Sequence, residues 1–161
     1  VCARLVHPLL VAPLIRTRRC ILTKPCRSAR LLPMLTLQAI EEKLRARGWD
    51  PEPAEAEGTL HATHPTAEGS FPFYFRLSED WLILSIVPFM RVDGRPSLEL
   101  SRWLLRVNRD RHMAKFAYDE DGDIVLTAEL PTASLSDEEI GLALDELLTM
   151  AREQKKMLRG D

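Results

Sequence analysis

Three carboxylates stand at alternate positions of the segment YDEDGDIVLTAEL, at Asp119, Asp121 and Asp123, a spacing that resembles the start of a calcium-binding loop. Such a loop has glycine at its sixth position and a bidentate glutamate at its twelfth. Here Gly122 is the fourth residue, and Leu130 occupies the position of the glutamate. The pattern therefore favours a solvated hairpin turn, in which glycine supplies the positive φ that a tight turn requires.

Two histidines and an asparagine are the other candidate ligands. His61 and His64 lie three residues apart, but the segment is expected to be a strand followed by a turn. No cysteine or carboxylate motif completes a tetrahedral set with them, so we predict no metal site. Asn108 stands where a predicted helix ends, a position at which an asparagine usually satisfies backbone groups rather than a ligand. We therefore predict a structural role for Asn108.

The sequence contains no glycine-rich phosphate loop, nucleophile elbow or Cys/His pair. Phe71, Phe73, Phe75 and Trp81 could form the floor of a site for an apolar peptide, but aromatic residues at alternate positions favour a core interpretation for most of them. We predict no catalytic residue, no cofactor and no metal, and hence a protein that is not an enzyme. An enzyme would require a buried cluster of carboxylates or histidines that only the fold could assemble.

The helix predicted over residues 97–109 has apolar residues on two sides. At 100° per residue one side, lined by Leu100, Trp103, Leu104 and Val107, faces the core. The opposite side carries the residues that we predict to form a partner or dimer surface: Leu98, Arg102, Leu105, Arg106 and Arg109. Together with Arg111 the arginines form a basic strip suited to an acidic partner, and the alternative interpretation is a solvated helix face.

The first 33 residues differ from the rest in charge and cysteine content. They carry seven basic residues, no acidic residue and all three cysteines, whereas the remainder carries 15 basic and 24 acidic residues. Prolines and arginines interrupt any apolar run long enough to span a membrane, and the composition fits an organellar transit peptide better than a secretory signal. The change falls directly before Met34, which favours Met34 as the true start. We predict that residues 1–33 are a basic leader, disordered or absent from the working protein, and that residues 34–161 form the domain.

The periodicity of the remainder predicts one α+β domain. Helices are expected over 36–47, 97–109 and from Ser136 onward, where Ser136 and Glu139 form a capping box. Strands are expected over 58–63, 71–77, 81–90, 113–118 and 123–130, with a turn over 64–69. The order is α-β-β-β-α-β-β-α, which indicates an antiparallel sheet packed by helices. Because this domain is acidic, nucleic acid is not an expected partner, and no membrane association is expected either.

Three segments carry a resemblance to a known family: WLLRVNRDRHMAKF, YDEDGDIVLTAELP and SLSDEEIGLALDELL. They resemble the YbjN family of bacterial proteins, labelled as sensory transduction regulators, from Met34 to roughly Leu158. The fold of that family is similar to that of class I type III secretion chaperones, which are small acidic dimers that bind extended client segments without catalysis. The resemblance implies a dimeric binding module in the bacterial cytoplasm, with the second helix in the dimer contact.

The predicted function is therefore that of a non-enzymatic protein-binding, chaperone-like or regulatory module, which acts as a homodimer on an unknown protein client or regulator. The alternative is a small-molecule-sensing regulatory domain in signal transduction. That alternative would need an enclosed pocket lined by the second helix and the sheet.

Overall fold

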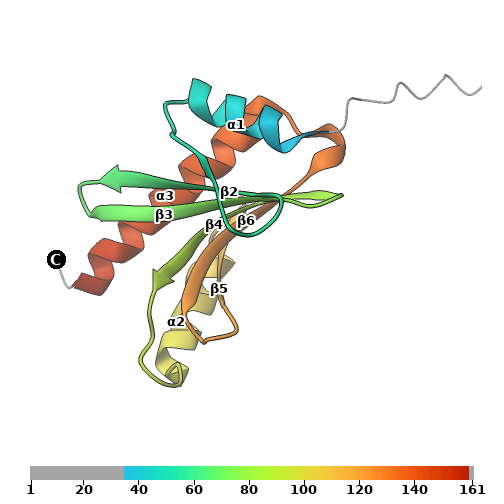
Figure 1. Ribbon diagram of the computed structural model, residues 1–161. Helices are drawn as coiled ribbons and strands as arrows, with labels where there is room; N and C mark the ends of the chain where they lie inside the picture. The colour runs from blue at the N-terminus through green and yellow to red at the C-terminus, as the bar shows by residue number, and fades with distance from the viewer. Residues whose placement is uncertain (1–34, 160–161) are drawn as a thin grey trace, which may run out of the picture. The chain divides into compact units, whose positions relative to one another are not determined.

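The computed structural model describes residues 35–159, so the predicted leader lies outside the described residues. In chain order the elements are α1 (Leu37–Ala46), β1 (Glu52–Pro53), β2 (Thr59–Thr66), β3 (Gly69–Leu77), β4 (Trp81–Met90), α2 (Leu98–Arg109), β5 (Ala114–Tyr118), β6 (Ile124–Pro131), the 3-10 turn η1 (Thr132–Ser134) and α3 (Asp137–Arg159), as Figure 1 shows. The predicted α+β fold is confirmed, with the short strand β1 and the turn η1 added to it.

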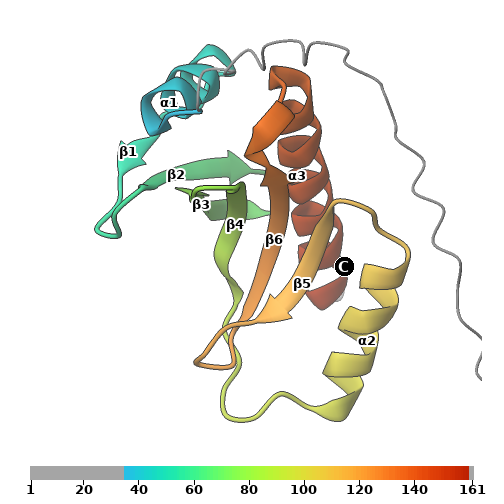
Figure 2. The same ribbon diagram turned by 90° about the vertical axis from the view of Figure 1, so that its right-hand side faces the viewer.

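The strands form one antiparallel sheet in the order β1-β2-β3-β4-β6-β5. β4 lies between β3 and β6, as its nearly continuous apolar sequence predicts for a central strand. Its register against β6 shifts between Ile86 and Met90, where Pro88 interrupts the ladder. Figure 2 shows α2 beside β5 at the edge of the sheet and α3 running along β6.

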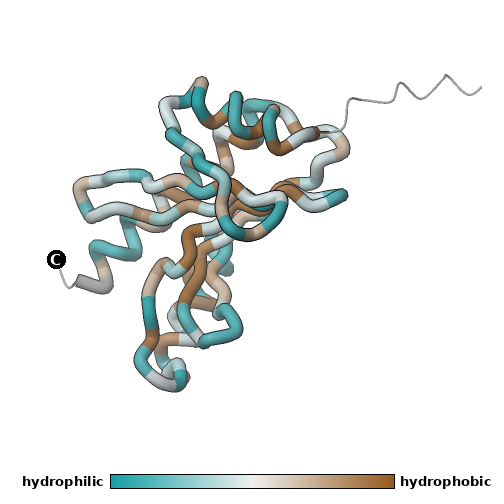
Figure 3. Tube along the Cα trace, in the orientation of Figure 1, coloured by the Kyte–Doolittle hydropathy of each residue, from teal (hydrophilic) through white to brown (hydrophobic). Residues whose placement is uncertain are grey.

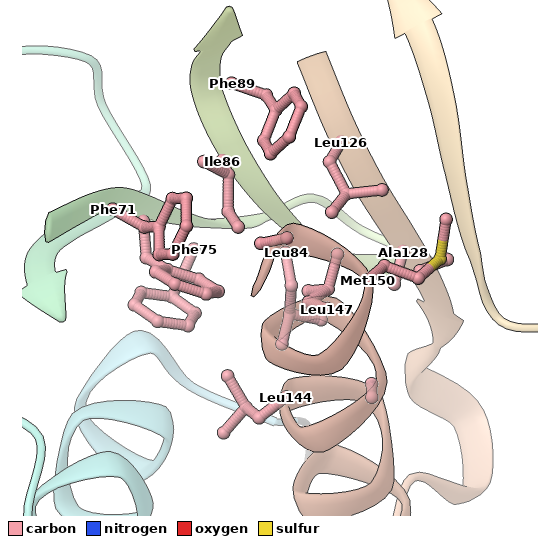
Figure 4. Close-up of a cluster of buried hydrophobic side chains, with 14 of the residues drawn as sticks. Phe71, Phe75, Leu84, Ile86, Phe89, Leu126, Ala128, Leu144, Leu147 and Met150 are labelled. Atoms are coloured by element: carbon pink, nitrogen blue, oxygen red, sulfur yellow. The ribbon is translucent and has the colours of Figure 1, made fainter. Parts of the chain in front are cut away.

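One face of the sheet forms the core with α1 and α3. Figure 4 shows Leu144, Leu147 and Met150 of α3 packed against side chains of β3, β4 and β6. Trp49, which follows α1, meets Phe73 and Phe75 edge to face at centroid distances of 4.8 and 5.8 Å. Figure 3 shows that hydrophobic stretches concentrate along the central strands, whereas the helices alternate between hydrophobic and polar residues.

Among residues 35–159 the opposite face of the sheet carries no helix. Cross-strand register places Tyr74, Ser85, Thr127 and Lys115 in one row across β3, β4, β6 and β5. All four side chains are partly exposed, and the hydroxyl groups of Ser85 and Thr127 lie 3.0 Å apart within hydrogen-bond distance. This outer face is mixed, because the partly exposed Ile83 and Val125 lie on it beside the polar residues.

Side-chain caps fix where the helices begin. The Thr36 hydroxyl accepts a hydrogen bond from the Ala39 N–H at 3.2 Å, and Ser97 caps α2 in the same way. The predicted capping box of α3 is confirmed, because the Ser136 N–H donates to the Glu139 carboxylate at 2.8 Å and the Glu139 N–H donates back to the Ser136 hydroxyl at 3.2 Å.

One local prediction was wrong. The segment from His64 to Gly69 is not all turn, since β2 continues to Thr66 and pairs with Gly69. β2 tolerates Pro65 because β1 covers only Leu60 and His61, so Pro65 lies beyond the paired part of that edge and its missing N–H costs no ladder hydrogen bond there. The structure also adds β1, which the sequence did not indicate.

Candidate functional site

α2 is amphipathic in the manner that its sequence predicts. On its inner side Leu104 is only 4% exposed, and Leu100, Trp103 and Val107 pack partly buried against the core. On its outer side Leu98 and Leu105 are 64% and 68% exposed. The five predicted surface residues share this outer side and are all exposed: Leu98, Arg102, Leu105, Arg106 and Arg109. We call this set the α2 surface.

The arginines of the α2 surface differ in what they contact. Arg109 forms a two-point ion pair with the neighbouring Asp110, with N···O distances of 2.8 and 3.1 Å. This hydrogen-bonded pair raises the pKa of Arg109 and lowers the pKa of Asp110. Arg106 donates from Nε to the Arg102 carbonyl oxygen at 3.3 Å. Within residues 35–159 neither Arg102 nor Arg106 forms an ion pair, so two charges of this surface lack a carboxylate partner in the fold.

Arg111 does not extend the basic strip as the sequence suggests. Its guanidinium group turns toward α3, where it pairs with Glu153 and lies 3.8 Å from the Glu146 carboxylate. Arg111 is half-buried in this position. The strip therefore ends at Arg109, and Arg111 instead ties the segment after α2 to α3.

Asn108 fixes α2 against the edge strand β5. Its side-chain amide donates to the Phe116 carbonyl oxygen at 2.9 Å and accepts from the Phe116 N–H at 2.8 Å. Lys115 adds a hydrogen bond from Nζ to the Asn108 carbonyl oxygen at 2.7 Å. At the other end of α2 the hydroxyl groups of Ser101 and Tyr118 lie 3.1 Å apart. The predicted structural role of Asn108 is confirmed, and these contacts hold the α2 surface in a fixed orientation.

The acidic hairpin uses its carboxylates to build the turn. Asp119 Oδ1 accepts from the N–H groups of Asp121 and Asp123 at 3.1 and 2.9 Å. Asp123 Oδ1 accepts from the Val92 N–H at 2.8 Å. Gly122 has φ +86°, as the hairpin interpretation predicts. Among the described residues there is no cluster of three or more His, Cys, Asp or Glu side chains able to hold a metal ion.

The two histidines lie on opposite faces of the sheet and do not converge. His61 stacks on Tyr74 at a centroid distance of 5.3 Å, whereas His64 stacks on Trp49 at 4.5 Å. Burial lowers the pKa of His64, and the positive charge of Arg152 lowers it further. His64 therefore packs against the aromatic core, and the two histidines do not form a common ligand site.

The aromatic residues divide between the core and the surface. Phe71, Phe73 and Phe75 are at most 2% exposed, which confirms the core interpretation, but Trp81 at the start of β4 is 45% exposed. Beside Trp81 the β3–β4 turn and η1 border an open groove of about 1020 Å³ that the sequence did not indicate. No sequence motif marks this groove, because its walls come from four separate segments.

No helix within residues 35–159 combines the length and the hydropathy needed to cross a bilayer. The family model described as "YbjN: Putative bacterial sensory transduction regulator" matches residues 36–158. The chain belongs to the YbjN family. No curated protein sequence matches this YbjN-family chain.

Solved structures share the fold of this YbjN-family protein. YbjN from E. coli has a TM-score of 0.57 at 19% identity, covering 80% of this chain and 96% of its own. A chain of the heterodimeric ExoU–SpcU complex, from the type III secretion system of Pseudomonas aeruginosa, has a TM-score of 0.51 at 24% identity. The match covers 74% of this chain and 93% of that one. A chain of the ExsC–ExsE complex has a TM-score of 0.56 at 22% identity, and the match covers 76% of this chain and 95% of that one. At these identities the likeness establishes the fold.

Proposed function

We propose that this YbjN-family protein is a non-enzymatic protein-binding module of the bacterial cytoplasm, which pairs as a homodimer through the α2 surface and acts on a protein client or regulator. The observation that carries the proposal is the exposure of Leu98 and Leu105 on the outer side of α2. Fully burying a leucine contributes about 1.5–3 kcal/mol, so covering the exposed two thirds of each contributes about 1–2 kcal/mol. A symmetric contact buries four such leucines.

A two-fold contact between antiparallel copies of α2 makes use of the charges as well. Such a contact is isologous, so each residue pair occurs twice. If Leu98 of one copy meets Leu105 of the other, helical spacing brings the exposed Glu99 of one copy opposite Arg106 of the other on the same flank. Arg102 then lies nearest the two-fold axis, where its long side chain reaches solvent. The pairing gives Arg106 a carboxylate partner, which residues 35–159 of its own copy do not provide.

The family and the structural neighbours support a role in protein binding or regulation. The family description names sensory transduction regulation. Two neighbours, ExoU–SpcU and ExsC–ExsE, are complexes of two different proteins. For the alternative, a small-molecule sensor, the expected pocket would be lined by α2 and the sheet. Four grooves among residues 35–159 have no lining residue from α2, so none of them supports the sensor.

Charge reversal tests this pairing directly. Sedimentation velocity compares the unmodified chain with Glu99→Arg, Arg106→Glu and the double variant. Each single reversal places like charges opposite each other at two symmetric positions and is expected to weaken the dimer about tenfold or more, whereas the double reversal restores it. Lys156→Glu, on the exposed end of α3, is the matched control and leaves the mass unchanged.

If the double reversal dissociates as readily as the singles, the antiparallel arrangement is wrong. If the unmodified chain is monomeric at every concentration measured, the proposed homodimer is wrong. The α2 surface would then be a binding site for a different protein.

A further inference from the structure

A second exposed surface lies at the end of the sheet that bears the β3–β4 turn, on the far side of the fold from α2 (Figure 1). It is an open groove of about 1020 Å³ between the β1–β2 connection, the β3–β4 turn, η1 and the residue that precedes α1. Its apolar lining includes the half-buried Leu35 and Leu77. Trp81, 45% exposed, directly follows the residues of the turn that line the groove.

Hydrogen bonds make the walls of this groove rigid. Thr132 of η1 binds two residues of the β3–β4 turn, since its N–H donates to the Asp80 carbonyl oxygen at 2.9 Å and its hydroxyl donates to the Glu79 carbonyl oxygen at 3.2 Å. Ser78 donates from both its N–H and its hydroxyl to the Trp81 carbonyl oxygen, at 2.9 and 3.2 Å. The walls are thus fixed through backbone groups, and the acidic side chains of the turn are left for solvent or a partner.

Acidic residues dominate the rim. Glu57, Glu79 and Asp80 are exposed and line the groove, and none of them forms an ion pair within residues 35–159. Arg76 is the one basic residue in the lining and is likewise exposed. A groove with two leucines in its lining and a net negative rim complements a segment that is basic and partly apolar. The same charge repels nucleic acid.

We propose that this groove is a second protein-binding surface, which takes a basic, partly apolar segment of a protein partner. Lysine or arginine side chains of the segment pair with Glu57, Glu79 and Asp80, and its apolar side chains contact the wall that Leu35 and Leu77 form. Because the groove and the α2 surface lie on different elements, a dimer formed through α2 would present one groove on each copy. The surface is independent of whether the chain dimerises.

The test uses the full chain and a fluorescein-labelled peptide of alternating leucine and lysine. Fluorescence anisotropy measures binding, and the amide NMR resonances of Ser78 and Thr132, which line the groove, report whether the peptide reaches it. Glu79→Gln with Asp80→Asn removes two charges and is expected to weaken binding about three- to tenfold, since each exposed pair contributes modestly.

Glu120→Gln with Asp121→Asn is the matched control, because it removes the same charge from the exposed β5–β6 turn. It is expected to leave the peptide affinity within roughly twofold of the unmodified chain. Equal weakening by both double variants would show that only overall charge matters and would overturn the proposal. So would Ser78 and Thr132 amide resonances that do not move on binding, or tighter binding of a peptide of alternating leucine and glutamate. Unchanged melting temperatures verify that all variants are folded.

Discussion

Replacing Asn108 by alanine tests how the fold holds α2 in place. The substitution removes two hydrogen bonds, at 2.9 and 2.8 Å, that join the Asn108 amide to the C=O and N–H of Phe116. A hydrogen bond contributes about 1 kcal/mol net, and a buried backbone group left unpaired costs about 1–3 kcal/mol. The site is half-buried, so water reaches part of it and the lower end of this range applies. Alanine recovers up to about 0.6 kcal/mol in helix propensity.

The expected net loss for Asn108→Ala is about 2–3 kcal/mol in the free energy of unfolding. For a domain of this size, that corresponds to a decrease in Tm of about 6–12 °C. Urea unfolding followed by circular dichroism measures the loss, and amide hydrogen exchange locates it, since the Phe116 N–H loses its acceptor and exchanges faster. Arg109→Ala is the matched control on the same turn of α2. It removes only an exposed pair with Asp110 and is expected to change stability by less than about 0.5 kcal/mol.

The reasoning fails if Asn108→Ala unfolds within about 0.5 kcal/mol of the unmodified chain. It also fails if stability falls but exchange at Phe116 is unchanged, because the loss would then come from somewhere other than the α2–β5 contact.

Three further predictions concern the core, the loops and pH. Leu104→Ala is expected to cost about 2–5 kcal/mol in urea unfolding because Leu104 is 4% exposed. At a protein concentration low enough for the chain to be monomeric, Leu105→Ala at 68% exposure is expected to cost less than about 0.5 kcal/mol, and equal costs would contradict the assigned faces of α2. Gly58→Ala is expected to be more destabilising than Gly94→Ala by urea midpoint, since both have positive φ but only at Gly58 would the new Cβ meet a backbone oxygen, at 3.1 Å. Burial and the positive charge of Arg152 lower the pKa of His64, so the imidazole binds a proton less readily in the folded state than in the unfolded state. The stability that the neutral His64 contributes is therefore complete above a pH of about 6.5 and is lost as the pH falls through the lowered pKa. His64→Asn should flatten the pH dependence of the unfolding free energy in that window, and an unchanged slope would exclude His64 as its source.

Local sequence signals predicted most elements because each depends on a few neighbouring residues. The Ser136–Glu139 capping box, the positive φ of Gly122 and the two sides of α2 all follow from spacing alone. The inward-facing phenylalanines of β3 follow from strict alternation. The exposure of Leu98 and Leu105 could also be predicted, since the helical period places them opposite the centre of the side formed by Leu100, Trp103, Leu104 and Val107.

The features that the sequence did not reveal depend on pairing between distant segments. β1 has two residues and is a strand only because β2 lies beside it. Thr66 remains in β2 because Gly69 pairs with it, although the prolines and polar residues nearby favour a turn. Arg111 turns from α2 to carboxylates of α3 that lie more than 30 residues further along the chain, a contact that no helical wheel shows. The groove at the β3–β4 turn likewise joins four separate segments.

Sedimentation velocity of Leu98→Asp with Leu105→Asp tests the central claim most directly. The claim predicts that the unmodified chain is a dimer and that this variant is a monomer that still unfolds cooperatively, because both leucines are exposed within one chain. Leu142→Asp, at a leucine of α3 that is 55% exposed, is the matched control and should remain dimeric. A variant at Leu98 and Leu105 that keeps the dimer mass would contradict pairing through the α2 surface.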